Sequence, residues 1–262
     1  MDIRTVDVKE NILVENNKKA QELRKKLQEK DIFFINVMAS PGAGKTTLLI
    51  ELINKLKHKY NIGVMEADID GDVDAHRIQN LTGVRSIQVH TSGACHLTAQ
   101  MVEDAIEEFD LKDINLLILE NVGNLVCPAE FDTGSHLNMM LLSVPEGHDK
   151  PLKYPLMFQV SQIVVITKID TLPVFKFDVE LCKEYIHRRN KDAVIYTASA
   201  LKHEGIDDIV KEIDGRISWV KIYINNKWKI LVSTRIFELM ILINLIMEPN
   251  IVYNKCGTGV RT

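Results

Sequence analysis

Cysteine is scarce in this sequence of 262 residues, and the four cysteines are Cys95, Cys127, Cys182 and Cys256. They are too few and too scattered to form the disulfide framework of a secreted protein. The first residues contain no apolar signal segment, and no apolar run approaches the length that spans a membrane. We therefore expect a cytoplasmic protein with reduced thiols.

An excess of positive charge is also missing, because the formal net charge is −4. A general surface for nucleic acid or for an anionic membrane would need a basic balance. We therefore expect neither a nucleic-acid partner nor a membrane partner. The content of 46% hydrophobic and 26% charged residues is ordinary for a soluble globular protein.

A glycine-rich turn is the most informative feature that the chain does contain. It lies between the apolar run 32–38 and a helical stretch at 46–60, and it reads Ala39-Ser40-Pro41-Gly42-Ala43-Gly44-Lys45-Thr46. A strand, a glycine-rich turn and a helix in this order are typical of a phosphate-binding P-loop, although Ala39 replaces the usual first glycine. The predicted contacts to a nucleotide come from Gly42, Ala43, Gly44, Lys45, Thr46 and Thr47.

The chemistry of these residue types supports the prediction. Glycines allow backbone N–H groups to curl round a phosphate, and the N-terminus of the following helix favours negative charge. Lys45 would bridge the β- and γ-phosphates, and the Thr46 hydroxyl would coordinate Mg²⁺.

Strand and helix patterns alternate from residue 32 onward. The apolar runs lie at 32–38, 62–67, 86–90, 114–119, 139–144, 162–167 and 193–197. Repeated βα units with nearly continuous apolar strands predict an α/β fold of the P-loop NTPase type, a mostly parallel sheet with helices on both faces. Ligands of such sheets bind at the carboxyl ends of the strands.

The predicted organisation has three parts. A helical extension occupies residues 1–30, a P-loop GTPase domain occupies 31–218, and an atypical tail occupies 219–262. The tail does not continue the βα rhythm, and it fits an appended element, a partner-binding segment or a sequence artefact equally well.

Acidic residues follow two of the predicted strands. Asp68 follows the run 62–67, and Glu120 follows the run 114–119. At a strand end beside a P-loop, either carboxylate could hold Mg²⁺ or orient an attacking water, so both are candidate catalytic residues with Lys45. Gly123 would let the backbone approach the γ-phosphate.

A further strand end carries a motif for the nucleobase. The segment Thr167-Lys168-Ile169-Asp170 follows an apolar run, and Ser199 and Ala200 follow the next one. The Asp170 carboxylate can accept two hydrogen bonds from guanine that adenine does not offer. The Lys168 stem would lie along the base, and the loop at Ser199 and Ala200 would recognise the guanine oxygen. GTP is therefore favoured over ATP.

Thiols and imidazoles occur at two other places. Cys95 and His96 are adjacent at the expected start of a helix, which would favour a thiolate, and Cys127 lies seven residues after Glu120. Thiolate and imidazole ligands suit Ni²⁺ or Zn²⁺. From spacing alone, structural cysteines and metal ligands are equally acceptable interpretations.

Several loops taken together resemble the HypB family, GTPases that assist nickel insertion into [NiFe]-hydrogenase and, in some organisms, urease. The resemblance covers about residues 8–218 and rests on the segments 40–47, 93–97, 120–129 and 149–155. It implies a homodimer in the GTP state with a metal site at the interface, whose ligands match Cys95, His96 and Cys127. It also implies the nickel chaperone HypA and the hydrogenase large-subunit precursor as partners.

The leading hypothesis is therefore a metallochaperone GTPase that uses GTP, Mg²⁺ and Ni²⁺ or Zn²⁺. Some members of the family carry a cysteine cluster or a histidine-rich tract near the N-terminus, but residues 1–57 contain neither residue type. The alternative is a regulatory GTP-binding module whose cysteines are structural and which has no nickel role. A P-loop kinase is a third interpretation, and the motif ending in Asp170 argues against it.

Overall fold

The computed structural model describes residues 8–68, 71, 73–91 and 93–220. The chain divides into two units, Met1–Asp214 and Gly215–Thr262. In the second unit only residues 215–220 are described, and they are helical. The predicted tail therefore lies almost entirely outside the described residues.

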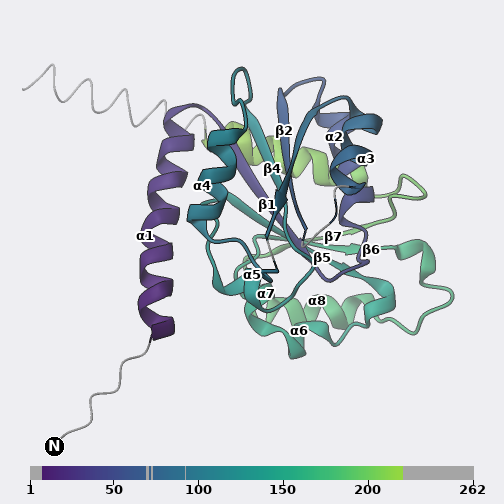
Figure 1. Ribbon diagram of the computed structural model, residues 1–262. Coiled ribbons are helices and arrows are strands. Elements are labelled where there is room, and N and C mark those ends of the chain that lie inside the picture. The colour runs from purple at the N-terminus through teal and green to yellow at the C-terminus, as the bar shows by residue number, and fades with distance from the viewer. Residues whose placement is uncertain (1–7, 69–70, 72, 92, 221–262) are drawn as a thin grey trace, which may run out of the picture. The chain divides into compact units, whose positions relative to one another are not determined.

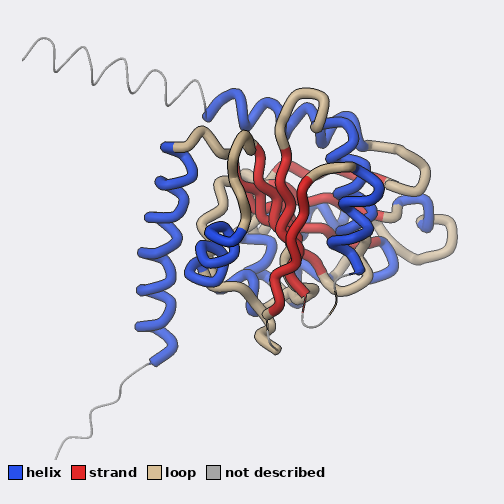
Figure 2. Tube along the Cα trace, turned by 45° about the horizontal axis from the view of Figure 1, so that its top comes forward, coloured by secondary structure: helices blue, strands red, loops and turns tan. Residues whose placement is uncertain are grey.

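A seven-stranded sheet forms the centre of the first unit (Figures 1 and 2). All strand pairs are parallel, and the order across the sheet is β3-β2-β4-β1-β5-β6-β7. The strands are β1 (Phe33–Ala39), β2 (Ile62–Asp68), β3 (Arg85–His90), β4 (Leu116–Glu120), β5 (Leu137–Ser143), β6 (Ile163–Thr167) and β7 (Val194–Ala198). Each predicted apolar run overlaps one of these strands, and the prediction of a parallel α/β fold is confirmed.

The connections between the strands are mostly helical. The helices are α1 (Val8–Glu29), α2 (Lys45–Leu56), α3 (Val73–Thr82), α4 (Ala99–Glu108), α5 (Cys127–Glu130), α6 (Lys150–Lys153), α7 (Pro155–Gln159) and α8 (Val179–His187). Short 3₁₀ turns lie at Val144–Glu146 and Ile169–Thr171. Residues 206–214 are helical as well.

Helices cover both faces of the sheet (Figure 1). Phe34 and Met38 point to the same face of β1, because side chains alternate along a strand. Phe34 packs in a cluster with residues of α1 and α4, and Met38 packs in a cluster with residues of α7 and α8. Helices α2 and α3 contact each other and cover the opposite face. Burial on both faces explains why the strand sequences are nearly continuous apolar runs.

A row of three amides crosses the middle of the sheet. The side chain of Asn121, directly after β4, donates from Nδ2 to Oδ1 of Asn36 on β1 at 3.0 Å. Asn36 in turn donates to Oδ1 of Asn138 on β5, also at 3.0 Å. Because Asn36 and Asn121 are buried, these bonds satisfy polar groups that would otherwise destabilise the sheet.

Helix α1 packs on the same core as the strands. Its residues Leu23 and Leu27 are 1% exposed and lie in one cluster with Phe34, Val102 and Ile106. The predicted helical extension is thus a part of the hydrophobic core, lying beside α4 (Figure 1). Among the described residues, no helix combines the length and apolar character that crossing a bilayer requires.

Candidate nucleotide and metal sites

The P-loop joins the end of β1 to the start of α2. Gly42 and Gly44 have φ angles of +73° and +94°, in the left-handed region that glycine adopts without a steric penalty. Gly44 is the N-cap of α2, and Lys45 and Thr46 are its first residues. The backbone N–H groups of this first helical turn have no partner within the helix, so the turn can accept a phosphate.

Thr46 is linked to the end of a neighbouring strand. Its Oγ1 donates a hydrogen bond of 2.8 Å to Oε1 of Glu120, the last residue of β4. Both side chains are buried. The predicted Mg²⁺ ligand of the P-loop and the predicted carboxylate therefore lie together.

A cluster of three carboxylates surrounds this position. One oxygen each of Glu66, Asp74 and Glu120 lies within 4.8 Å of the others. Glu66 and Glu120 are 4% and 2% exposed, and each has one buried carboxylate oxygen without a hydrogen-bond partner. Burial raises the pKa of Glu66 to about 7, with a further contribution from the charge of Glu120. Burial likewise raises the pKa of Glu120 to about 7. Buried carboxylate oxygens without a hydrogen-bond partner are hard ligands that fit a divalent cation such as Mg²⁺.

Gly123 lies against the P-loop three residues after Glu120. A Cβ atom on Gly123 would lie 3.0 Å from the backbone nitrogen of Pro41. A side chain at this position would crowd Pro41, so glycine favours the close approach of the segment after β4 to the P-loop backbone. The segment is therefore in a position to respond to what the P-loop binds.

Two residues of the segment predicted to bind the nucleobase also contact the P-loop. Lys168 Nζ donates to the carbonyl of Gly42 at 2.7 Å, and Thr167 Oγ1 donates to the carbonyl of Ala43 at 2.8 Å. Ser199 Oγ donates to Oδ1 of Asp170 at 2.5 Å. A pocket of about 170 Å³ lies between these segments, and its lining includes Gly44, Thr47, Lys168, Asp170, Thr171 and Ala200.

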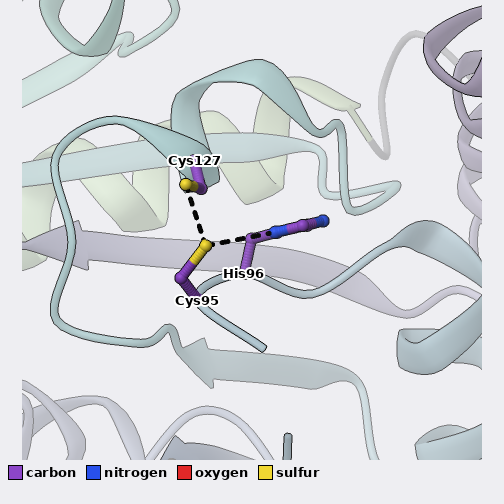
Figure 3. Close-up of side chains that lie close together, drawn as sticks. All are labelled: Cys95, His96 and Cys127. Atoms are coloured by element: carbon purple, nitrogen blue, oxygen red, sulfur yellow. Dashed lines mark hydrogen bonds between the residues drawn. The ribbon is translucent and has the colours of Figure 1, made fainter. Parts of the chain in front are cut away.

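Cys95, His96 and Cys127 come together as a third group (Figure 3). The Sγ atoms of Cys95 and Cys127 are 2.9 Å apart, and Cys95 Sγ lies 3.7 Å from Nδ1 of His96. Both cysteines are free thiols. Two sulfur atoms and one imidazole at this separation form a partial coordination shell for a soft or borderline metal ion.

The protonation of this group differs from the expectation for Cys95. Helix α4 begins only at Ala99, so Cys95 does not lie at the helix N-terminus. The hydrogen bond with Cys127 raises the pKa of the Cys95 thiol instead. Burial lowers the pKa of His96, which favours the neutral imidazole that binds metals.

Comparisons with known proteins identify the family of this chain. Residues 33–197 match the family described as CobW/HypB/UreG, nucleotide-binding domain. The hydrogenase maturation factor HypB of Azotobacter chroococcum is 44% identical over 205 residues, which cover 78% of this chain and 67% of the relative. The chain belongs to the HypB family.

Two further HypB proteins support this assignment. The hydrogenase/urease maturation factor HypB of Helicobacter hepaticus is 40% identical and is 84% covered. The crystal structure of HypB from Helicobacter pylori in complex with nickel has a TM-score of 0.73 at 37% identity, covering 78% of this chain and 95% of that one. The HypB fold and its nucleotide-binding domain are therefore shown for this chain.

Sequence reasoning missed two members of the carboxylate cluster, Glu66 and Asp74. Asp68 was expected beside the P-loop, and it is the exposed last residue of β2. Glu66, two residues earlier, lies in the cluster, and so does Asp74 in the first turn of α3. An acidic residue inside the apolar run 62–67 was the available signal for Glu66, because a buried charge is seldom retained without a partner.

Proposed function

We propose that this protein is a GTP-hydrolysing metallochaperone that assists nickel delivery during maturation of [NiFe]-hydrogenase or urease. The observation that carries the proposal is the convergence of Cys95, His96 and Cys127 in a chain that also forms a P-loop. The names of the relatives, hydrogenase and hydrogenase/urease maturation factors, support the same role.

The residues for hydrolysis come from three strand ends. Lys45 would neutralise charge on the β- and γ-phosphates, and Asp170 would select guanine. Thr46 and Glu120, with Glu66 and Asp74 beside them, would hold Mg²⁺, which when bound screens the charge that develops on the phosphates. Asp68 is the exposed carboxylate near this cluster and is proposed to orient the attacking water.

The metal ligands of one chain leave the coordination shell incomplete. Three ligands per chain are one short of a tetrahedral or square-planar set. A second copy related by a two-fold axis would bring the same ligands to the same point. We therefore include a homodimer in the GTP state, with Ni²⁺ or Zn²⁺ between the subunits, and transfer partners that include HypA and the hydrogenase large-subunit precursor.

The two sites share one short piece of backbone. Glu120 binds Thr46, Gly123 lies on Pro41, and Cys127 follows four residues later. Loss of the γ-phosphate would release the segment around Gly123 and would thereby displace Cys127. Hydrolysis would then loosen the metal, which is what a delivery protein requires.

Titration calorimetry with Ni²⁺ tests the proposal. The protein is loaded with a non-hydrolysable GTP analogue in one experiment and with GDP in the other. We expect about one nickel ion per two chains and tighter binding in the GTP state, since binding and nucleotide state are reciprocally coupled. The Cys95→Ser variant is the control for binding at the proposed ligands.

Two other results would change the proposed function. Equal affinity and stoichiometry in both nucleotide states would show that the segment 120–127 does not govern the metal site. Nucleotide-dependent partner binding without any nickel binding would favour the regulatory GTP-binding module, in which the cysteines are structural.

A further inference from the structure

One polar residue interrupts the apolar face of α1. Ala20, Leu23 and Leu27 are buried on that face, and residue 16 lies on the same face one turn before Ala20. Asn16 occupies this position and is only 7% exposed. A buried amide destabilises the folded state unless hydrogen bonds satisfy it. The partners of Asn16 therefore indicate why an amide stands there.

Both ends of the Asn16 amide bind backbone groups of segments that are far apart in the sequence. Nδ2 donates to the carbonyl of Asp132 at 2.9 Å, and Oδ1 accepts from the N–H of Ala99 at 2.8 Å. Ala99 is the first residue of α4, so its N–H has no partner inside its own helix. Thr98 caps the N–H of Met101, whereas the N–H of Ala99 is satisfied by Asn16 from another helix.

These two segments carry the two halves of the metal-ligand set. Cys95 and His96 lie just before Ala99, and Cys127 opens the short helix α5, which ends two residues before Asp132. The His96 ring also stacks on Phe131, with ring centroids 3.8 Å apart. The Asn16 side chain thus joins the backbone at Ala99, after Cys95 and His96, to the backbone at Asp132, after Cys127.

Arg24 strengthens the attachment of the second segment to α1. Its Nη2 lies 2.7 Å from each carboxylate oxygen of Asp132, and its Nε donates to the carbonyl of Ser135 at 2.7 Å. Eight residues separate Arg24 from Asn16, which is about 12 Å along the helix. Helix α1 therefore binds the segment after α5 from two positions along its length, Asn16 and Arg24.

We propose that Asn16 is a positioning residue for the Cys95, His96 and Cys127 metal centre. It fixes the distance between the segment that carries Cys95 and His96 and the segment that carries Cys127. This inference rests on the proposed function only in requiring that the centre binds nickel. It gives α1 a role in the metal chemistry although α1 carries none of the three ligands.

The test compares two substitutions at neighbouring asparagines in the whole 262-residue chain. Asn16→Leu fills a similar volume on the apolar face and removes both hydrogen bonds. Asn17→Leu makes the same change at an exposed position. Ni²⁺ is titrated into each protein, the thiolate-to-nickel charge-transfer absorption is recorded, and a competing chelator gives the affinity.

We expect Asn16→Leu to bind Ni²⁺ roughly tenfold more weakly, as is found for residues that orient metal ligands. Its charge-transfer bands should also shift, since the ligand geometry changes. Asn17→Leu should match the wild type in both measurements. Affinity for a GTP analogue should be unchanged in either variant.

Wild-type affinity and an unshifted spectrum in folded Asn16→Leu would overturn the inference. Should that variant fail to fold, Asn16→Asp replaces it, because it keeps the acceptor for Ala99 and loses the donor to Asp132. Unchanged nickel binding in Asn16→Asp would likewise overturn the inference. A wild type without any nickel band would instead refute the proposed function, so the two failures are distinguishable.

Discussion

The proposed nucleotide pocket and the proposed metal centre differ in how much of each site a single chain supplies. Thr46 and Glu120 are buried and hydrogen-bonded at the ends of adjacent elements. Cys95 is exposed, and His96 and Cys127 are half-buried. Cys95 and His96 lie on the connection before α4, and Cys127 is the first residue of the four-residue helix α5. The sheet fixes the first site within one chain, whereas the second offers a partial ligand set at the surface.

This difference indicates that the two regions serve different purposes, selective nucleotide binding in one and exchangeable metal binding in the other. A pocket at the ends of buried strands is rigid and suits selective binding of one nucleotide. A metal shell on surface segments can open, close and be shared with another molecule. Substitutions that affect one region and spare the other will test whether the two are separable.

The largest effect is expected at the P-loop. Lys45→Ala removes the only charge that would contact the β- and γ-phosphates from within the loop. We expect kcat/KM for GTP hydrolysis to fall about 1,000-fold, with nickel binding to the nucleotide-free protein retained. A phosphate-release assay and a chelator competition measure the two activities, and a parallel loss of nickel binding would show that the sites are not separable.

The reciprocal substitution is Cys127→Ala. Removing one of three ligands should weaken Ni²⁺ binding by at least about 100-fold, since partners of metal ligands alone account for 10- to 100-fold. GTP hydrolysis should stay within about twofold of the wild type, because the P-loop and the carboxylates are unaltered. Cys182→Ala, at a fully buried cysteine outside the centre, is the matched control.

Base selectivity can be altered inside the nucleotide pocket alone. Asp170→Asn removes a carboxylate that would accept two hydrogen bonds from guanine, so GTP affinity should fall roughly 30-fold. Xanthosine triphosphate should gain affinity, since an amide can donate to its C2 carbonyl. An unchanged preference of the variant for GTP over xanthosine triphosphate would contradict the guanine assignment. Nickel affinity of the nucleotide-free protein should not change.

Acid should lower the folding stability through His136. Burial, with a contribution from the charge of Arg24, lowers the pKa of His136 to about 4. Between pH 4 and 6.5 the unfolded chain binds a proton that the folded protein does not, so stability falls as the pH falls. The expected loss between pH 7 and pH 5 is about 2 kcal/mol.

The variant His136→Asn isolates this effect. Asparagine can still accept the hydrogen bond from the N–H of Phe34, which His136 accepts through Nδ1 at 3.0 Å, but it does not titrate. Urea unfolding at pH 7 and pH 5 should show a smaller loss in the variant than in the wild type. An identical loss would assign the acid sensitivity to other groups.

The smallest effect is expected for Glu66→Gln. An amide keeps the volume and one oxygen ligand but removes a charge beside Glu120, so turnover should fall about tenfold. Binding of Mn²⁺ with a GTP analogue, followed by electron paramagnetic resonance, should weaken in parallel. Asp68→Asn is the paired variant, and a loss of turnover without a loss of Mn²⁺ affinity there would separate the water-orienting residue from the cation site.

Patterns of residues within a few positions of one another could be predicted from the sequence. The strand at 33–39 and the P-loop after it follow from an apolar run and glycine spacing, which are properties of a single segment. The parallel sheet follows from repeating such units. Gly123 was placed near the phosphate for the same reason, as it follows a strand end directly.

Contacts between distant segments could not be predicted in this way. Asn16 was predicted only as part of the helical extension at residues 1–30, because its hydrogen-bond partners lie 83 and 116 residues away. Asp74 was not among the predicted site residues, yet its carboxylate lies close to those of Glu66 and Glu120, which are on the neighbouring strands β2 and β4. Such contacts depend on which strands and helices lie side by side. That arrangement is a property of the whole fold and is not encoded in any one segment.

The row formed by Asn121, Asn36 and Asn138 has a consequence for how the chain folds. The three strands that it crosses are separated by many residues, so they find one another late and could pair in a shifted register. A shift by two residues would keep apolar side chains inside and would therefore cost little hydrophobic burial. It would, however, leave buried amides without partners. The row of amides thus disfavours sheets with a shifted strand register. Its disruption should affect refolding, as slow or heterogeneous kinetics, more than it affects the equilibrium free energy of unfolding.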